Sequence, residues 1–196
     1  TEWGSNVISK DFGEKMEVLH HVPEIEATEL HERIARGDKL VILDTRTPEE
    51  YQRFCIPGGR SVPGGELALR ITDITKDLDK NTTVIVNCAG RTRSIIGTRV
   101  LQRMGFTNVY GLKNGTSGWV LAGYALETGA DRLALPEPSP EGLAAAEAYA
   151  DRLASEDGVR YVDMPTLQAM LGKRDRDTAY FVDVRTQQEY EHGHIP

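Results

Sequence analysis

The sequence predicts an α/β domain with a mostly parallel central sheet and helices on both of its faces. Two apolar runs rich in branched residues, Lys39–Leu43 and Thr83–Asn87, are typical of strands buried on both faces. Helical patterns alternate with these runs, and such alternation is typical of parallel sheets whose two faces are covered by the helices. The 196 residues exceed one ordinary domain, and a partial second copy of the opening pattern follows the first.

The first elements follow from caps and turns. Residues 1–24 show no sustained periodicity and are interpreted as a linker or an upstream remnant. Glu29–Arg36 is predicted to be a short helix, because Gly37 follows it as a C-terminal cap. After the first apolar run, Pro48–Tyr51 begins a helical turn, since proline is tolerated at the first helical positions.

A longer helix is predicted after the second apolar run. Ile96, Val100 and Met104 share one apolar face of this helix. Gly105 is predicted to end this helix. Val109–Leu112 is then the third short strand of the sheet.

Further elements are predicted toward the C-terminus. A short helix over Thr116–Ala122 carries Trp119, which we assign to the core rather than to a stacking surface. Leu135–Pro140 is rich in proline, which predicts a stiff, extended spacer. Two helices and then a strand are predicted beyond it, over Glu141–Ser155, Met164–Leu171 and Ala179–Val182.

The last part of the chain repeats part of the first. Val41–Pro57 aligns without gaps on Tyr180–Pro196, with 7 identities in 17 positions. We therefore expect the chain to be a piece of a longer tandem array. The predicted segments are a linker or upstream remnant over 1–24, a complete domain over 25–130, a proline-rich and helical linker over 131–158, and the incomplete start of a second domain over 159–196.

The amino-acid composition argues against several classes of function. The net charge of −7 argues against a nucleic-acid-binding protein. Residues 25–130 nevertheless hold 14 basic and 12 acidic side chains, a local excess that suits a small anionic substrate. Two cysteines give no disulfide framework, and so few cysteines and histidines predict no metal site. No apolar run could span a bilayer, so we expect no membrane partner and a cytoplasmic location; we also expect no cofactor.

Cys88 is the strongest candidate for chemistry. It ends a predicted strand and precedes a helix, so its sulfur should lie among backbone N–H groups at the positive end of the helix dipole. Gly90 permits a tight loop, and Arg91 and Arg93 add positive charge. These features favour the thiolate over the thiol. No histidine lies near Cys88 in sequence, so the loop itself would replace a general base.

Three motifs point to a known family. They are Leu43–Tyr51 followed by Ile56-Pro57, the loop Cys88–Ser94, and Leu112–Trp119. Together they resemble the signatures of the rhodanese family of sulfurtransferases, over residues 25–129 and again from about 159 to the end. The arrangement is similar to bacterial proteins that carry several such domains in series. The resemblance implies a rhodanese-like fold followed by a partial second copy, against which the first domain could pack.

The resemblance implies a two-step transfer of sulfur. Cys88 would attack the outer sulfur of thiosulfate, or of a related small anionic donor, and become a persulfide. The persulfide would then pass its sulfur to a thiol or to cyanide. The surrounding loop would bind the anion through Ala89, Gly90, Arg91, Thr92, Arg93 and Ser94. Whether one or both arginines face the substrate stays open, since either could instead pair with a carboxylate.

Two other functions remain open, a phosphatase or arsenate reductase and a non-catalytic binding module. The first needs an arginine after the cysteine and five further residues, where this chain has Ser94. The second typically lacks the cysteine, and Cys88 is present. Cys55 stands where the second copy has histidine, which leaves open a role as a resolving thiol. Asp44 and Arg46 are interpreted as a structural pair that orders the backbone.

Overall fold

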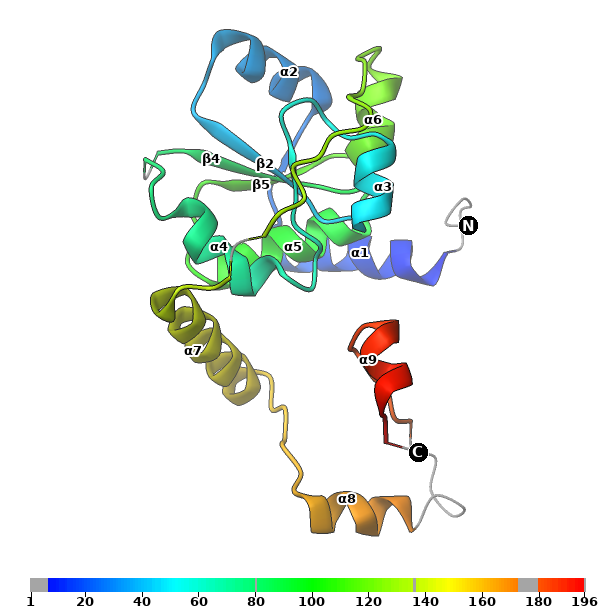
Figure 1. The fold of residues 1–196 in the computed structure, drawn as a ribbon. Coiled ribbons are helices and arrows are strands. Elements are labelled where there is room, and N and C mark those ends of the chain that lie inside the picture. The colour runs from blue at the N-terminus through cyan, green and yellow to red at the C-terminus, as the bar shows by residue number, and fades with distance from the viewer. Residues whose placement is uncertain (1–6, 80, 136, 173–179, 196) are drawn as a thin grey trace. The chain divides into compact units, whose positions relative to one another are not determined.

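The computed structural model describes residues 7–79, 81–135, 137–172 and 180–195. The chain divides into two compact units, Thr1–Asp151 and Arg152–Pro196. The first unit contains a five-stranded parallel sheet in the spatial order β1-β5-β4-β2-β3 (Figure 1). The strands are β1 (Glu24–Ile25), β2 (Leu40–Asp44), β3 (Arg60–Ser61), β4 (Thr83–Asn87) and β5 (Val109–Leu112).

The central strand β4 positions the candidate cysteine. All five of its residues are buried, as its uninterrupted apolar pattern predicts. It pairs with β2 in register, from Leu40 opposite Thr83 to Asp44 opposite Asn87. Parallel strands end at one edge of the sheet, and ligands bind beyond the carboxyl ends of such strands. Cys88, which follows β4 directly, therefore lies at the edge where sites form in sheets of this kind.

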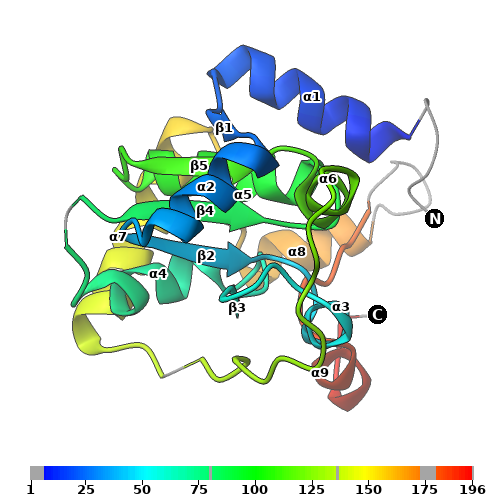
Figure 2. The ribbon, with the colours of Figure 1, turned by 90° about the horizontal axis from the view of Figure 1, so that it is seen from above.

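Helices cover both faces of the sheet (Figures 1 and 2). On one face lie α2 (Ala27–Arg36) and α6 (Gly115–Leu121), and on the other α4 (Leu67–Thr75) and α5 (Thr92–Arg103). Ile85 packs into the core beneath α2 and α6 together with Trp119, whereas Val84 and Val86 pack beneath α4 and α5. The predicted α/β fold is confirmed, and so is the assignment of Trp119 to the core.

Most predicted boundaries agree with the structure to within two residues. The strands over 83–87 and 109–112 have the expected bounds. Helix α2 ends at Arg36, and Gly37 follows in the left-handed conformation with φ 73°, where glycine carries no steric penalty. The helix that begins at Pro48 is α3, which ends at Arg53.

Residues 1–24 are interpreted from the sequence as a linker or an upstream remnant, and the structure shows that this segment contains a helix and the start of an edge strand. Residues Ile8–His20 form α1, which packs alongside α5, and β1 adds an edge strand. At Gly13 the two helices approach so closely that a β-carbon would lie 3.1 Å from the α-carbon of Thr92. The only buried residue of α1 is Gly13, while Ile8, Val18 and Leu19 are exposed. The helix therefore lacks the apolar stripe by which such elements are recognised in sequence.

The face of α5 that carries Ile96 is not the side most deeply buried, although Met104 of that face packs against the core. Ile96 is 41% exposed, and the buried side of the helix is formed by Ser94, Ile95, Gly97, Thr98 and Leu101. Small residues dominate this side because the helix lies close to the sheet. A β-carbon at Gly97 would lie 3.0 Å from a methyl carbon of Val86. The close approach keeps the first turn of α5 next to the end of β4.

Three helices follow the sheet: α7 (Pro140–Glu156), α8 (Met164–Leu171) and α9 (Gln187–His192). The first two were predicted with nearly these bounds. The strand predicted over Ala179–Val182 is not formed at 180–182, and Ala179 lies outside the described residues. A strand needs a hydrogen-bonded neighbour, and the described part of the second unit contains no other strand.

Candidate active site

Cys88 lies at the wall of a cavity beyond the end of β4. The cavity has a volume of about 520 Å³. Cys88–Arg93 line one side, Ser9 and Lys10 of α1 a second, and Asn114, Ser117 and Leu121 a third. The cysteine side chain is otherwise almost fully enclosed, because Cys88 is only 1% exposed. The cavity therefore gives a small reagent a route to the sulfur.

The first residues of α6 hold the Cys88 loop by donating hydrogen bonds to the carbonyl groups of the loop. The amide of Thr116 donates to the carbonyl of Cys88 at 2.9 Å, and the Ser117 amide and hydroxyl both donate to that of Ala89, at 3.1 and 2.9 Å. Gly115 has φ 54°, and a β-carbon there would overlap the carbonyl oxygen of Cys88. Glycine is required at this position for two reasons, the left-handed backbone conformation and the close approach of the Cys88 carbonyl.

The carbonyls of Cys88 and Ala89 accept hydrogen bonds from α6. The amides of the loop make no such bonds to the described residues of α6. The first N–H groups of any helix lack acceptors within that helix, and those of α5 begin at Thr92. Within the described residues, no backbone carbonyl accepts a hydrogen bond from the amides of residues 89–94. A ring of unpaired amides at a helix N-terminus attracts anions. The loop next to Cys88 is therefore suited to hold a negative charge.

Ser94 connects the cysteine to the loop. The Cys88 thiol donates to Ser94 Oγ at 3.5 Å, and that hydroxyl donates to the carbonyl of Arg91 at 2.8 Å. Ser94 is completely buried and lies outside the cavity lining. Its hydroxyl therefore links the sulfur to the backbone of the loop.

Arg91 is turned toward carboxylates of the N-terminal segment. Its guanidinium hydrogen-bonds to Glu17 and to Glu24, the latter at 3.1 Å, and lies 3.8 Å from Glu14. Burial raises the pKa of Glu24, and the neighbouring Glu17 adds to this, while Arg91 opposes it. The sequence left open whether Arg91 faces a substrate, and here its charge is matched by three acidic side chains.

Arg93 is paired as well. Both terminal nitrogens contact Glu50 of α3, at 2.7 and 2.9 Å. This bidentate contact is the main reason why the pKa of Glu50 falls to about 2. Both side chains are 38% exposed, so the pair is accessible to solvent. Each loop arginine therefore carries a carboxylate partner.

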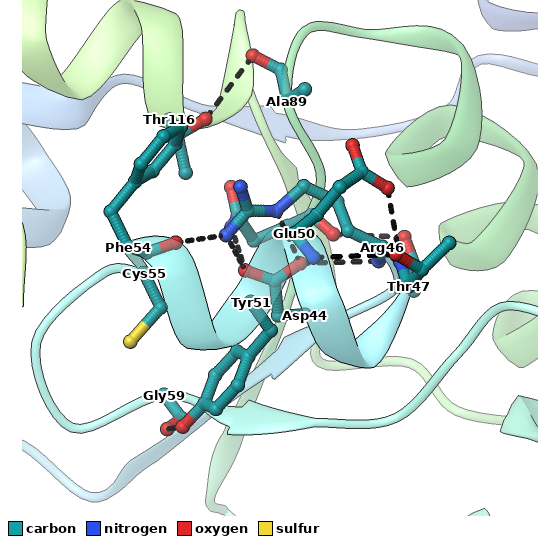
Figure 3. Close-up of polar contacts among 12 residues, drawn as sticks. Asp44, Arg46, Thr47, Glu50, Tyr51, Phe54, Cys55, Gly59, Ala89 and Thr116 are labelled. Carbon is teal, nitrogen blue, oxygen red and sulfur yellow. Dashed lines mark hydrogen bonds and ion pairs between the residues drawn. The ribbon is translucent and has the colours of Figure 1, made fainter. Parts of the chain in front are cut away.

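Asp44 and Arg46 form an ion pair at the end of β2 (Figure 3). Arg46 donates to both oxygens of Asp44, at 2.9 and 2.7 Å, and to the carbonyl of Phe54 at 2.6 Å. Asn87 donates to the same aspartate at 2.9 Å. Both charged side chains are only 1% exposed. They tie the end of β2 to β4 and to the turn after α3, as expected for a structural pair.

Cys55 lies in a separate small core with Tyr51 and Ala130, and it is completely buried. Burial raises the pKa of its thiol. A role as a resolving thiol for Cys88 stays a prediction.

In the described part of the chain, no group of histidine, cysteine, aspartate and glutamate side chains could hold a metal ion. None of the described helices is long and apolar enough to cross a membrane.

Residues 26–122 match the family model of the rhodanese-like domain. The chain carries a rhodanese-like domain. The matched segment contains β2 to β5 and α2 to α6, and therefore includes the Cys88 loop with the elements that hold it. The five-stranded sheet with helices on both faces agrees with this match.

Individual relatives extend the similarity. A solved thiosulfate sulfurtransferase from Pseudomonas aeruginosa is 46% identical with a TM-score of 0.85, and the match covers 96% of this chain and 35% of that one. A sulfurtransferase from Allochromatium vinosum is 29% identical over 121 residues, 62% of this chain and 99% of the relative. The thiosulfate sulfurtransferase PspE of Escherichia coli is 37% identical over 67 residues, 34% of this chain and 62% of the relative. The chain thus spans about a third of the Pseudomonas protein.

The rhodanese-like domain brings together the predicted loop residues but adds partners that sequence reasoning missed. Ser9 and Lys10 line the cavity, and Glu14, Glu17 and Glu24 surround Arg91. A signal did exist, because Lys10, Glu14 and Glu17 recur at helical spacing. The side chains at this spacing are polar, however, whereas a helix that packs on a core is recognised by a repeating apolar face.

Proposed function

We propose that the rhodanese-like domain transfers sulfane sulfur, taking it from thiosulfate or a related anionic donor and carrying it as a persulfide on Cys88. The observation that carries the proposal is the position of the Cys88 sulfur, at the wall of a cavity and next to amides that lack backbone acceptors. The names of the relatives from Pseudomonas aeruginosa and Escherichia coli favour thiosulfate as the donor.

The proposed reaction has two displacement steps. In the first, the Cys88 thiolate attacks the outer sulfur of thiosulfate, a new S–S bond forms, and the bond to the sulfonate sulfur breaks. Sulfite leaves with the electron pair of that bond. In the second, a thiol or cyanide attacks the outer sulfur of the persulfide and releases the thiolate. Electrons balance in each step, so the cycle needs no cofactor and no external oxidant.

The loop would stabilise the negative charge at each stage. Thiolate, persulfide and the sulfonate oxygens of the donor are all anionic, and the amides of residues 89–94 can donate to them. Because Arg91 and Arg93 already pair with carboxylates, we assign them mainly to holding the loop. The backbone would then supply most of the anion binding near the sulfur.

The geometry supports sulfur transfer over phosphate chemistry. A phosphatase loop would need an arginine where this chain has Ser94, and the Ser94 side chain is buried and bonded to the Arg91 carbonyl. The adjacent Arg93 contacts Glu50 instead. Hydrolysis of an aryl phosphate without any thiocyanate from thiosulfate and cyanide would contradict the proposal.

The decisive test is the mass of Cys88 after exposure to thiosulfate. Peptide mapping without reductant should show a gain of about 32 Da, one sulfur atom, on the peptide that contains Cys88. Cyanide should remove this mass and form an equivalent amount of thiocyanate. Cys88→Ser should abolish both signals while leaving the unfolding curve close to that of the natural protein, because the change is nearly isosteric.

Cys55→Ala is the matched control. The Cys55 sulfur lies in a closed core, so its removal should lower stability by about 1 kcal/mol but keep persulfide formation at Cys88. A sulfur adduct found on Cys55 rather than Cys88 would contradict the proposal. Equal turnover by the Cys88→Ser variant would do the same.

We also propose that residues 159–196 are the opening of a second rhodanese-like domain and that the chain belongs to a tandem array. The support is local. Asp183, Arg185, Thr186 and Glu189 repeat the local hydrogen bonds that join Asp44 to Arg46 and Thr47 to Glu50. The match to the Pseudomonas protein also covers nearly the whole chain, including this segment.

A further inference from the structure

The first turn of α1 forms part of the cavity wall and is fixed there by two contacts. Thr92 Oγ1 donates to the carbonyl of Ser9 at 3.0 Å. Four residues later, Gly13 packs directly against Thr92. Since Thr92 is the first residue of α5, these contacts tie the start of α1 to the same helix end that supports the Cys88 loop. Ser9 and Lys10 are therefore built into the site.

The basic side chains around the cavity differ in how closely they pair with carboxylates. Among the described residues of the cavity lining, three are basic, Lys10, Arg91 and Arg93, and none is acidic. Arg93 makes a bidentate pair at 2.7 Å and Arg91 contacts several carboxylates. The ion pair of Lys10 is long by comparison, at 3.9 Å to Glu14, and its side chain is 51% exposed. Lys10 is thus the cation of the lining that is least committed to a protein partner.

We infer that Lys10 positions the anionic donor in the cavity by binding its oxyanion end while the loop amides hold the end nearest Cys88. The inference rests on the proposed function, which it deepens by naming a specificity residue outside the loop. A lysine suits this task, because its flexible stem and three donors can follow an anion that the rigid loop cannot surround. Lys10 should increase the affinity most for a sulfur donor that carries two negative charges.

The charge at Cys88 can be measured without any sulfur transfer. Iodoacetate is anionic and iodoacetamide is neutral, so the ratio of their alkylation rates at Cys88 reports the local potential. Lys10→Gln should lower this ratio about fivefold, as expected for one charge removed at close range. High salt should reduce the difference between the natural protein and the variant. Peptide mapping assigns the label to Cys88 rather than to Cys55.

Lys15→Gln is the matched control, and Lys10→Arg is the conservative variant. Lys15 lies on the same helix, pairs with Asp11 at 2.7 Å and is not among the described residues that line the cavity. Lys15→Gln therefore changes the net charge as much as Lys10→Gln does, but away from the cavity. The alkylation ratio should stay within about twofold of the natural value in both variants. An unchanged ratio in Lys10→Gln, or an equal fall in Lys15→Gln, would overturn the inference.

A second measurement follows the proposed reaction. In Lys10→Gln the thiosulfate concentration that half-saturates persulfide formation should rise about fivefold, with little change in the maximal rate. If the natural protein takes up no sulfur from thiosulfate, the proposed function fails, and the alkylation ratio still decides whether Lys10 attracts anions to Cys88. If sulfur uptake proceeds equally well in Lys10→Gln, the inference about Lys10 fails and the proposed function stands.

Discussion

The segments Asp44–Phe54 and Asp183–Gly193 build the same hydrogen-bonded unit in two settings. In each, an arginine two residues after the aspartate pairs with it, at 2.7 Å in the first and 2.6 Å in the second. The same arginine donates to a carbonyl eight residues further along, at 2.6 and 2.8 Å. A threonine–glutamate capping box then begins a six-residue helix in both. The motif therefore specifies its local geometry by itself.

The two segments differ in what surrounds them. Asp44 and Arg46 are 1% exposed, whereas Asp183 is 23% and Arg185 44% exposed. In the first segment the capping glutamate also holds Arg93 of the cysteine loop. In the described part of the chain no such contact reaches Glu189. Burial and the link to the loop thus come from tertiary packing, and we expect the energetic weight of each bond to follow them.

The largest contrast should appear when the arginine is removed. Arg46→Met leaves Asp44 buried without its charged partner, which should destabilise the rhodanese-like domain by about 3–5 kcal/mol. Urea unfolding followed by tryptophan fluorescence measures this, because Trp119 lies in the core of the domain. Adding Asp44→Asn to the variant removes the unpaired charge and should restore part of the loss.

Arg185→Met is the matched change in the exposed copy. Its aspartate partner stays hydrated, so the unfolding of the domain should not change measurably. Equal destabilisation by Arg46→Met and Arg185→Met would show that the motif contributes through local bonds alone. Burial would then not be the source of the difference between the two segments.

The same distinction explains what the sequence predicts well. The three longer strands of the sheet and the structural role of Asp44 and Arg46 depend on short, strongly patterned segments, and the structure confirms them. The helix α1 was missed because it buries only Gly13. The carboxylate partners of Arg91 and Arg93 were missed because they come from residues far away in sequence, such as Glu17 and Glu50. Tertiary pairing of charges leaves little periodic signal.

A smaller contrast is expected at the helix caps. Thr47 accepts a hydrogen bond from the Glu50 amide at 3.3 Å, and Thr186 accepts the same bond from Glu189 at the same length. Thr47→Ala should lower the stability of the domain by about 1 kcal/mol. Thr186→Ala should leave domain unfolding unchanged and should only speed amide hydrogen exchange within α9. A stability loss in both variants would contradict the view that the second copy acts locally.

The smallest effect should come from the ion pair that distinguishes the two glutamates. The pKa of Glu50 is lowered from 4.5 to about 2, mainly by the hydrogen bonds from Arg93, with smaller contributions from the Thr47 amide and the charge of Arg46. Stabilisation by the ionised form is therefore complete above about pH 4.5 and is lost as the pH falls toward 2. The pair is more than a third exposed, so solvent screening limits its contribution to about 1 kcal/mol or less. Glu50→Gln retains a capping side chain and removes only this charge.

The pH profile separates this ion pair from the cap. The difference in unfolding free energy between the natural protein and Glu50→Gln should be constant from about pH 7 to 5.5 and fall to roughly half or less by pH 3. Glu189→Gln, the matched change in the exposed copy, should not alter the profile of the domain, because Glu189 has no such contact with the cysteine loop. A difference for Glu50→Gln that stays constant down to pH 3 would mean that Arg93 contributes nothing. The cap alone would then account for the role of Glu50.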